Sequence, residues 1–231
     1  MLVFLNHYWL TGNIGSRWLP AATTPNDWKR LKMTIDLTLE RPLTNLDVRV
    51  VGIGGAGCSA LRSLGDSLPD DTRFLGIDTG TGTDSVRNFA EFIQVGDGFG
   101  SGGDAVAAAE LFVDSDGPGA YGKAVTEFVT GADVVIIVAG LGRGSGSGIA
   151  PLVAHIAHDS GALTLAAVNL PFEFEGRFRT QSAVQALEIL RNAVDTVIVT
   201  SNNDLLNPVR AAGSMSLVDA FKEADRKVSN S

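Results

Sequence analysis

The sequence is short of cysteine, of positive charge and of long apolar runs, and each shortage excludes a class of protein. The single cysteine, Cys58, cannot form a disulfide within the chain, which fits a reducing compartment such as the cytoplasm. No run of about 18 apolar residues is present, so we expect no membrane-spanning helix. Lys and Arg number 18 against 26 Asp and Glu, a net charge of −8, which argues against a nucleic-acid binder with a broad basic surface.

What is present is an alternation of short apolar runs with helical patterns. With 231 residues and 45% apolar content, the chain can bury one sizeable core. Strands separated by helices of ten or more residues pair in parallel, so we expect a doubly wound, mostly parallel, Rossmann-like α/β sheet with helices on both faces. Strands are expected at 48–53, 74–77, 134–138, 163–168 and 196–200, with a short apolar run at 92–95, and helices at 54–64, 105–113, 120–130, 149–160, 180–193 and 214–228.

The most informative stretch is AGLGRGSGSGIAP at 139–151, between an apolar strand and the expected helix near Ile149. Glycines allow backbone N–H groups to approach anionic oxygens closely, and the following helix adds partial positive charge. Ser145 and Ser147 carry hydroxyls that can donate to the same oxygens. No Lys-Ser or Lys-Thr pair follows the last glycine, so this is not a Walker A loop. A flexible linker is the alternative, but we favour a phosphate-binding loop.

A second glycine-rich loop, GIGGAG at 52–57, follows the first strand of the alternation and matches GxGxxG. Asp78 follows Gly57 by 21 residues, at the position of a ribose-binding acid. This pair alone supports an NAD-dependent oxidoreductase. However, such an enzyme does not explain the loop at 139–151, and neither His155 nor His158, both on an expected helix, forms a clear hydride-transfer arrangement.

Polar side chains also follow the later strands. In PFEFEGRFR at 171–179, Phe172 and Phe174 can anchor the loop, while Glu175 can accept from ribose hydroxyls and Arg179 can bind phosphate. An exposed loop held by salt bridges is the alternative. Asn202 offers a donor and an acceptor to a base, or caps a helix. In the expected helix 214–228, Phe221 and Asp225 share a face, and a carboxylate there can accept the two donors of guanine.

Together these motifs resemble the tubulin/FtsZ family of GTP-binding cytoskeletal proteins, over roughly Asp47 to Val228 and in the family's order. The segment PFEFEGR is closer to the bacterial and archaeal FtsZ branch than to eukaryotic tubulin. The resemblance implies binding of GTP and GDP, with Mg²⁺ as a candidate metal, and no metal ligand is assigned to the protein. The residues that it implies around the nucleotide are Gly54, Gly55, Ala56, Ser59, Gly103, Asp104, Gly142, Arg143, Gly144, Ser145, Gly146, Glu175, Arg179, Asn202, Phe221 and Asp225.

The sequence departs from the family pattern at three of its loop positions. Cys58 and Ser59 replace the usual Gly-Asn pair, and Arg143 replaces a signature glycine, where its Cβ could crowd the loop or its guanidinium could assist phosphate binding. These changes leave a third hypothesis open, a decayed scaffold that binds no nucleotide.

We expect residues 1–46 to be a poorly ordered extension, with translation beginning at Met33 as one interpretation, and residues 47–231 to be the GTP-binding domain. The resemblance implies that hydrolysis is completed by an acidic loop from the next filament subunit. That loop and the second domain would lie beyond Ser231, so we expect this chain to bind GTP without hydrolysing it alone. A full-length FtsZ-like filament subunit is then the expected partner.

Overall fold

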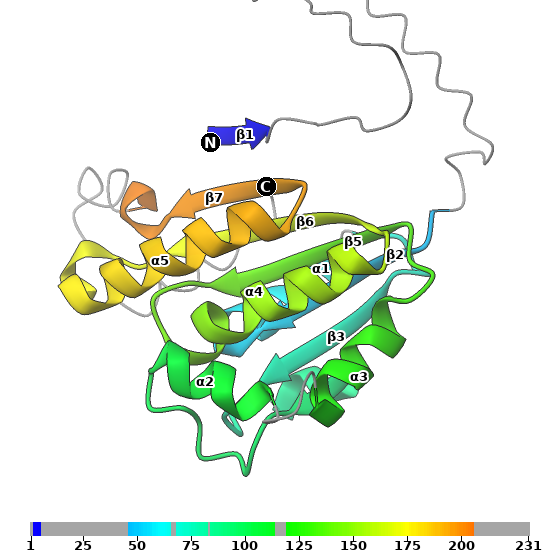
Figure 1. Cartoon of the computed structure of the whole chain (residues 1–231), viewed down its shortest axis with the longest axis horizontal. Coiled ribbons are helices and arrows are strands. Elements are labelled where there is room, and N and C mark those ends of the chain that lie inside the picture. Colours follow the sequence, from blue (N-terminus) through cyan, green and yellow to red (C-terminus); the bar gives the residue numbers. More distant parts are fainter. Residues whose placement is uncertain (1, 6–45, 66–67, 83, 114–118, 206–231) are drawn as a thin grey trace, which may run out of the picture. The chain divides into compact units, whose positions relative to one another are not determined.

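The computed structural model describes residues 2–5, 46–65, 68–82, 84–113 and 119–205. These residues form a sheet of seven strands in the order β1-β7-β6-β5-β2-β3-β4 (Figure 1). Strands β2 to β7 are all parallel, and β1 pairs antiparallel with β7 at one edge. The prediction of a doubly wound, mostly parallel α/β sheet is therefore confirmed. The strands are β1 (Leu2–Leu5), β2 (Val48–Ile53), β3 (Arg73–Asp78), β4 (Glu91–Gln94), β5 (Val134–Gly140), β6 (Leu163–Leu170) and β7 (Thr196–Ser201).

The described residues also form five α-helices and three short 3₁₀ helices. The α-helices are α1 (Gly54–Gly65), α2 (Ala105–Phe112), α3 (Gly119–Val129), α4 (Gly144–Asp159) and α5 (Arg177–Ala193), and the 3₁₀ helices are η3 (Asp84–Asn88), η4 (Glu173–Glu175) and η5 (Asn202–Leu205). Two helices begin three or more residues earlier than the sequence predicts: α4 at Gly144 instead of 149, and α5 at Arg177 instead of 180. The glycine-rich stretch after β5 is therefore mostly the first two turns of a helix.

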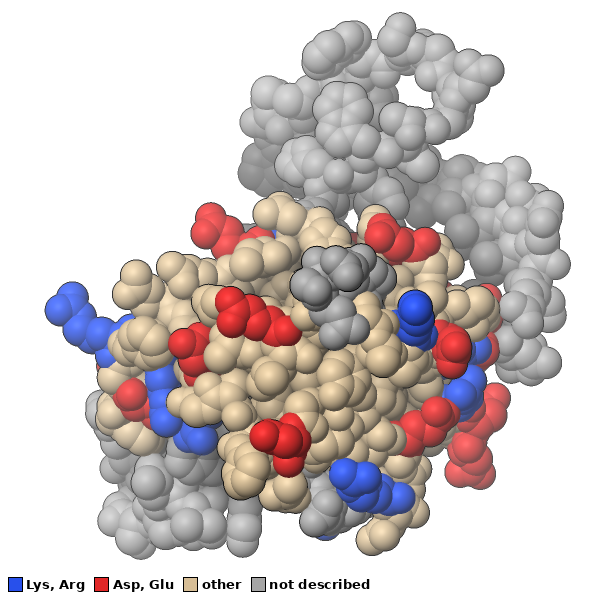
Figure 2. All heavy atoms as spheres, turned by 60° about the horizontal axis from the view of Figure 1, so that its bottom comes forward, with Lys and Arg blue, Asp and Glu red and all other residues tan. Residues whose placement is uncertain are grey.

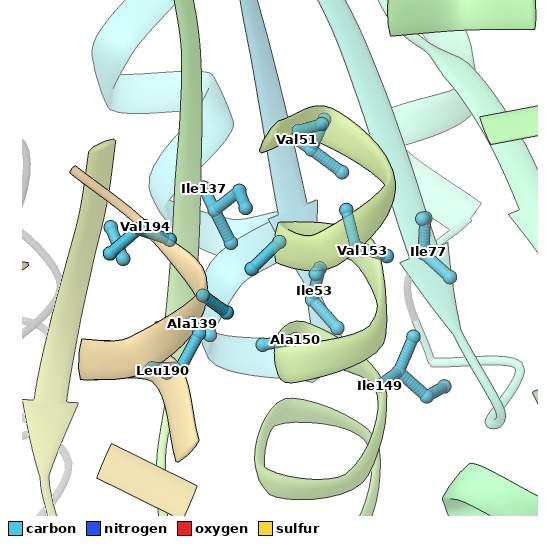
Figure 3. Close-up of a cluster of buried hydrophobic side chains, with 14 of the residues drawn as sticks. Val51, Ile53, Ile77, Ile137, Ala139, Ile149, Ala150, Val153, Leu190 and Val194 are labelled. Carbon is cyan, nitrogen blue, oxygen red and sulfur yellow. The ribbon is translucent and has the colours of Figure 1, made fainter. Parts of the chain in front are cut away.

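The helices cover both faces of the sheet because alternate residues of each buried strand point to opposite sides. On one face, Val51 and Ile53 of β2 pack in the larger core with α2, α3, α4 and α5. Figure 3 shows Ile149 and Val153 of α4 among these side chains. On the other face, Val50 packs with α1 and η3 in a smaller cluster. The packing of helices on both faces of the sheet places the starts of α1 and α4 at the carboxyl edge of the parallel strands.

Charged side chains of either sign are not gathered in one place on the face of the molecule that Figure 2 shows. On the face in Figure 2, acidic and basic side chains lie scattered among uncharged ones, without a basic stripe. Within the described ranges, no helix combines the length and the apolar character needed to cross a membrane.

Candidate nucleotide-binding site

Helices α1 and α4 begin side by side at the ends of the neighbouring strands β2 and β5, where glycine allows their backbones to meet. A Cβ added to Gly54, whose φ is +73°, would lie 3.2 Å from the backbone nitrogen of Gly146. A Cβ on Gly146 would lie 2.1 Å from the carbonyl oxygen of Gly140, closer than any side chain tolerates. These glycines therefore hold two helix N-termini together at one point of the sheet edge.

The first turns of these two helices have no side-chain cap of the kind that satisfies backbone N–H groups at the start of α2. Helix α2 is capped by Asp104, whose carboxylate accepts from the N–H groups of Val106 (2.8 Å) and Ala107 (3.2 Å). Helix α4 follows Arg143, which makes no side-chain cap, and neither α1 nor α4 has an acidic residue in its first turn. Uncapped N–H groups and aligned peptide dipoles favour an anion at this position.

Two cavities open at this point, and Gly54 and Arg143 line both. The first has a volume of about 400 Å³ and lies over the start of α1. Its lining comprises Ile53, Gly54, Gly55, Ala56, Ser59, Gly140, Leu141, Arg143, Asn169, Pro171, Glu175 and Asn202. The second has a volume of about 380 Å³, lies over the start of α4, and is lined by Gly54, Asp78, Thr79, Gly80, Gly100, Ser101, Gly102, Gly103, Arg143, Gly144, Ser145, Gly146 and Arg179.

Asn202 brings a buried polar atom without a protein partner to the first cavity. Its side chain is 8% exposed, and its Oδ1 accepts no hydrogen bond from the described part of the chain. A buried amide oxygen without a partner is costly, so this atom marks a place where a ligand donor fits. Asn202 opens η5, whereas the cap there is Ser201, whose Oγ accepts from the N–H of Asn203 at 3.3 Å.

Glu175 and Arg179 face the site from η4 and α5 as an ion pair. The Arg179 guanidinium donates to Oε2 of Glu175, and the N–H of Phe172 donates to Oε1 at 3.0 Å. Phe172 is fully buried and anchors the segment, whereas Phe174 stacks on it and stays 56% exposed, so only one of the two predicted anchors is in the core. Glu175 is only 7% exposed, so this ion pair is not the exposed salt-bridged loop of the alternative, and its two charged groups lie at the cavities.

The sequence predicts that Ser145 and Ser147, in the glycine-rich stretch 139–151, donate to a ligand. In the structure both hydroxyls instead bond within the protein. Ser147 Oγ accepts from the N–H of Gly142 at 2.7 Å, and Ser145 Oγ donates to Oδ1 of Asp78 at 2.8 Å. Both hydroxyls stabilise the loop from within. Gly142 lines neither cavity. Its φ of +99° favours glycine, so the turn and not a ligand requires a glycine at this position.

The sequence departures also have places in the structure. Cys58 is fully buried, and its thiol lies 3.4 Å from the carbonyl oxygen of Gly52, so its side chain faces the sheet from α1. Burial, followed by the nearby Asp78 charge, raises the pKa of the Cys58 thiol to about 12. Arg143 adopts an extended backbone with its side chain 61% exposed, so its Cβ does not crowd the loop.

The structure thus brings most of the predicted residues together. Gly54, Gly55, Ala56, Ser59, Gly103, Arg143, Gly144, Ser145, Gly146, Glu175, Arg179 and Asn202 line the cavities. Asp104 and Gly142 do not, and Phe221 and Asp225 lie outside the described residues. Sequence reasoning missed Asn169, which is 6% exposed at the end of β6; a polar residue closing a parallel strand was the available signal.

Comparisons with known proteins place this site in context. Residues 119–210 match the model of the tubulin/FtsZ family, GTPase domain. The chain is similar to an empty FtsZ dimer from M. jannaschii, with 31% identity and a TM-score of 0.71 over 90% of this chain and 57% of that one. It is also similar to CetZ2 from Haloferax volcanii, a GTPγS-bound protofilament, with 23% identity and a TM-score of 0.67 over 80% and 56% of the two chains, a likeness of fold alone. The chain therefore spans little more than half the length of these relatives.

Proposed function

Since this chain belongs by its fold to the tubulin/FtsZ family, we propose that residues 47–231 bind GTP and GDP in the two adjoining cavities. The observation that carries the proposal is the meeting of two uncapped helix N-termini beside the unpartnered Oδ1 of Asn202. Backbone N–H groups suit phosphate oxygens, and a buried amide suits the polar edge of a base. A nucleotide combines both groups in one molecule.

In this proposal the first cavity takes the nucleoside and the second takes the terminal phosphates. Asn202 reads the base, Glu175 accepts from the ribose, and the first turns of α1 and α4 bind the phosphates. Phe221 and Asp225 remain predicted guanine contacts. Mg²⁺ keeps several waters and prefers phosphate oxygens, so in this proposal it is bound chiefly by phosphates and waters, with few protein oxygens.

The wider role is proposed from the family resemblance. GTP hydrolysis would be completed by an acidic loop from a neighbouring subunit, and the partner would be a full-length FtsZ-like filament subunit in cell division or the cytoskeleton, acting in the cytoplasm. Turnover in the presence of such a subunit, and none in its absence, is the result we expect.

The structure argues against the oxidoreductase hypothesis because Asp78, the acid that it assigns to a ribose, has other partners. Asp78 is 8% exposed, and its Oδ1 accepts from both the N–H of Thr79 and the hydroxyl of Ser145, each at 2.8 Å. Asp78 also lines only the cavity over α4 and not the cavity that the proposal assigns to the nucleoside. Asp78 instead supports the start of α4.

The test is a pair of asparagine variants assayed with a fluorescent GTP analogue. Asn202→Ala should weaken binding roughly tenfold or more, because a buried polar contact to the base is lost. Asn192→Ala is the matched control, since Asn192 is exposed on α5 and bonds only locally to the carbonyl of Glu188. Equal affinity of Asn202→Ala and wild type would contradict the assignment of the base to this cavity.

A further inference from the structure

Arg143 occupies the junction of the two cavities. It is the residue before α4, and its side chain, 61% exposed, lines both the nucleoside cavity and the phosphate cavity. Its backbone makes the turn from β5 into α4, with Ser147 N–H bonded to its carbonyl oxygen at 3.3 Å. The backbone of Arg143 is therefore held in the turn, and its exposed side chain extends over the site.

The Arg143 guanidinium is held loosely, by a carboxylate that has a better partner. Its Nη2 lies 3.5 Å from Oε2 of Glu175, the same oxygen to which Arg179 donates a much closer hydrogen bond. Glu175 is 7% exposed and also accepts from the N–H of Phe172. If Arg143 turned away, this buried carboxylate would keep two donors, so the departure would not leave an unpaired buried charge. At 3.5 Å the Arg143–Glu175 contact is longer than a charge-assisted hydrogen bond, so it contributes less than the Arg179–Glu175 bond.

The charge balance of the cavities indicates where the Arg143 guanidinium would move when a phosphate binds. Among the described residues, the ionisable side chains that line the cavities are Arg143, Arg179, Glu175 and Asp78, whose formal charges sum to zero. Arg179 is paired with Glu175, and Asp78 is bonded to Ser145 and to the backbone of Thr79. Each added phosphate brings negative charge into this neutral space. Arg143 is the lining cation that can move toward it at the least cost.

We propose that Arg143 leaves Glu175 and binds the terminal phosphate of a nucleoside triphosphate, and so makes this site discriminate triphosphate from diphosphate. This inference rests on the proposed function, since it requires that the cavities bind a guanine nucleotide. Arginine suits this role because its planar fork pairs with phosphate oxygens through two N–H groups. The contact forms only when a phosphate occupies the cavity over α4, so a diphosphate gains little from it.

The experiment is calorimetric titration of the full chain with GTPγS and with GDP, for wild type and three variants. Arg143→Gln should weaken GTPγS binding roughly tenfold to a hundredfold, the range of a charge-assisted hydrogen bond, and GDP binding less than threefold. Arg143→Lys should recover much of the loss because it restores the charge. Arg62→Gln removes one positive charge from the exposed surface of α1, outside both cavity linings, and should change neither affinity.

The outcomes distinguish a failure of this inference from a failure of the proposed nucleotide binding. If wild type binds GTPγS and GDP but Arg143→Gln weakens both equally, or neither, the inference is wrong and the proposed function stands. If wild type binds neither nucleotide, both are overturned. Thermal unfolding of each variant identifies any that fails to fold, and the GTPγS-to-GDP affinity ratio of Arg143→Lys then decides the question. A ratio near that of wild type supports the inference, and a ratio of one overturns it.

Discussion

The Oγ atom of Ser145 donates a 2.8 Å hydrogen bond to Oδ1 of Asp78, and this bond joins the first turn of α4 to the end of β3. Thr79 Oγ1 lies 2.8 Å from the same serine oxygen, so the three side chains form a buried network. The network sets the position of the α4 N-terminus relative to the sheet. It therefore links the stability of the fold to the geometry of the phosphate cavity.

Ser145→Ala should lower the free energy of unfolding by about 1–3 kcal/mol, because the buried carboxylate of Asp78 loses a donor. It should also weaken nucleotide binding, since the α4 N-terminus is less well positioned. The control is Ser160→Ala at the other end of α4, where the hydroxyl donates only to the carbonyl of Ala157. Urea unfolding of both variants measures the difference, and equal losses of stability would count against the network.

Two glycines of the α1 loop should separate folding from binding. A Cβ on Gly57 would lie 2.2 Å from the carbonyl oxygen of Val138, so Gly57→Ala should destabilise the fold severely. A Cβ on Gly55 meets no atom within 4 Å, and its backbone has no positive φ, yet the residue lines the nucleoside cavity. Gly55→Ala should therefore unfold at the wild-type temperature or slightly above it, and bind nucleotide more weakly. Thermal unfolding and titration together check the pair; full binding by Gly55→Ala would remove Gly55 from the site.

Cys58 should make stability depend on alkaline pH. Its folded-state pKa of about 12 exceeds the ordinary thiol value of 9.0, so the unfolded state loses this proton first as the pH rises. The contribution is complete below pH 9 and is lost between pH 9 and 12, at up to roughly 1.4 kcal/mol per pH unit. Compared with Cys58→Ala, wild type should lose stability more steeply in this window. The native thiol should also react slowly with iodoacetamide at pH 8, and labelling as fast as in the unfolded chain would refute its burial.

The sequence predicts the alternation of elements well because buried strands such as 134–138 are continuous apolar runs with helical patterns between them. It misses the first turn of α4. Gly144, Gly146 and Gly148 are weak helix formers with a spacing of two, so neither propensity nor periodicity indicates a helix there. The structure explains them by close approach: a Cβ on Gly148 would lie 2.1 Å from the carbonyl oxygen of Ala105. Tertiary packing therefore selects these glycines.

For the site, too, the sequence predicts the position of the loops but not the contacts of individual side chains. The loops that follow the parallel strands were identified from sequence because carboxyl ends of parallel strands share one edge. The roles of individual side chains within them were not, since those depend on partners far along the chain. Asp104 is an example: its carboxylate caps α2 and lines neither cavity. The oxidoreductase alternative places Asp78 on a ribose, whereas its partner in the structure, Ser145, is 67 residues away.

The central claim is that the adjoining cavities bind a guanine nucleotide, and titration calorimetry of the purified chain with GTP, GDP, ATP and NADH, with Mg²⁺ present, tests it most directly. The account predicts tight binding of GTP and GDP and none of ATP or NADH. Binding of NADH without GTP would favour the oxidoreductase hypothesis. Binding of none of the four would contradict the account and leave a scaffold that has the fold without the ligand.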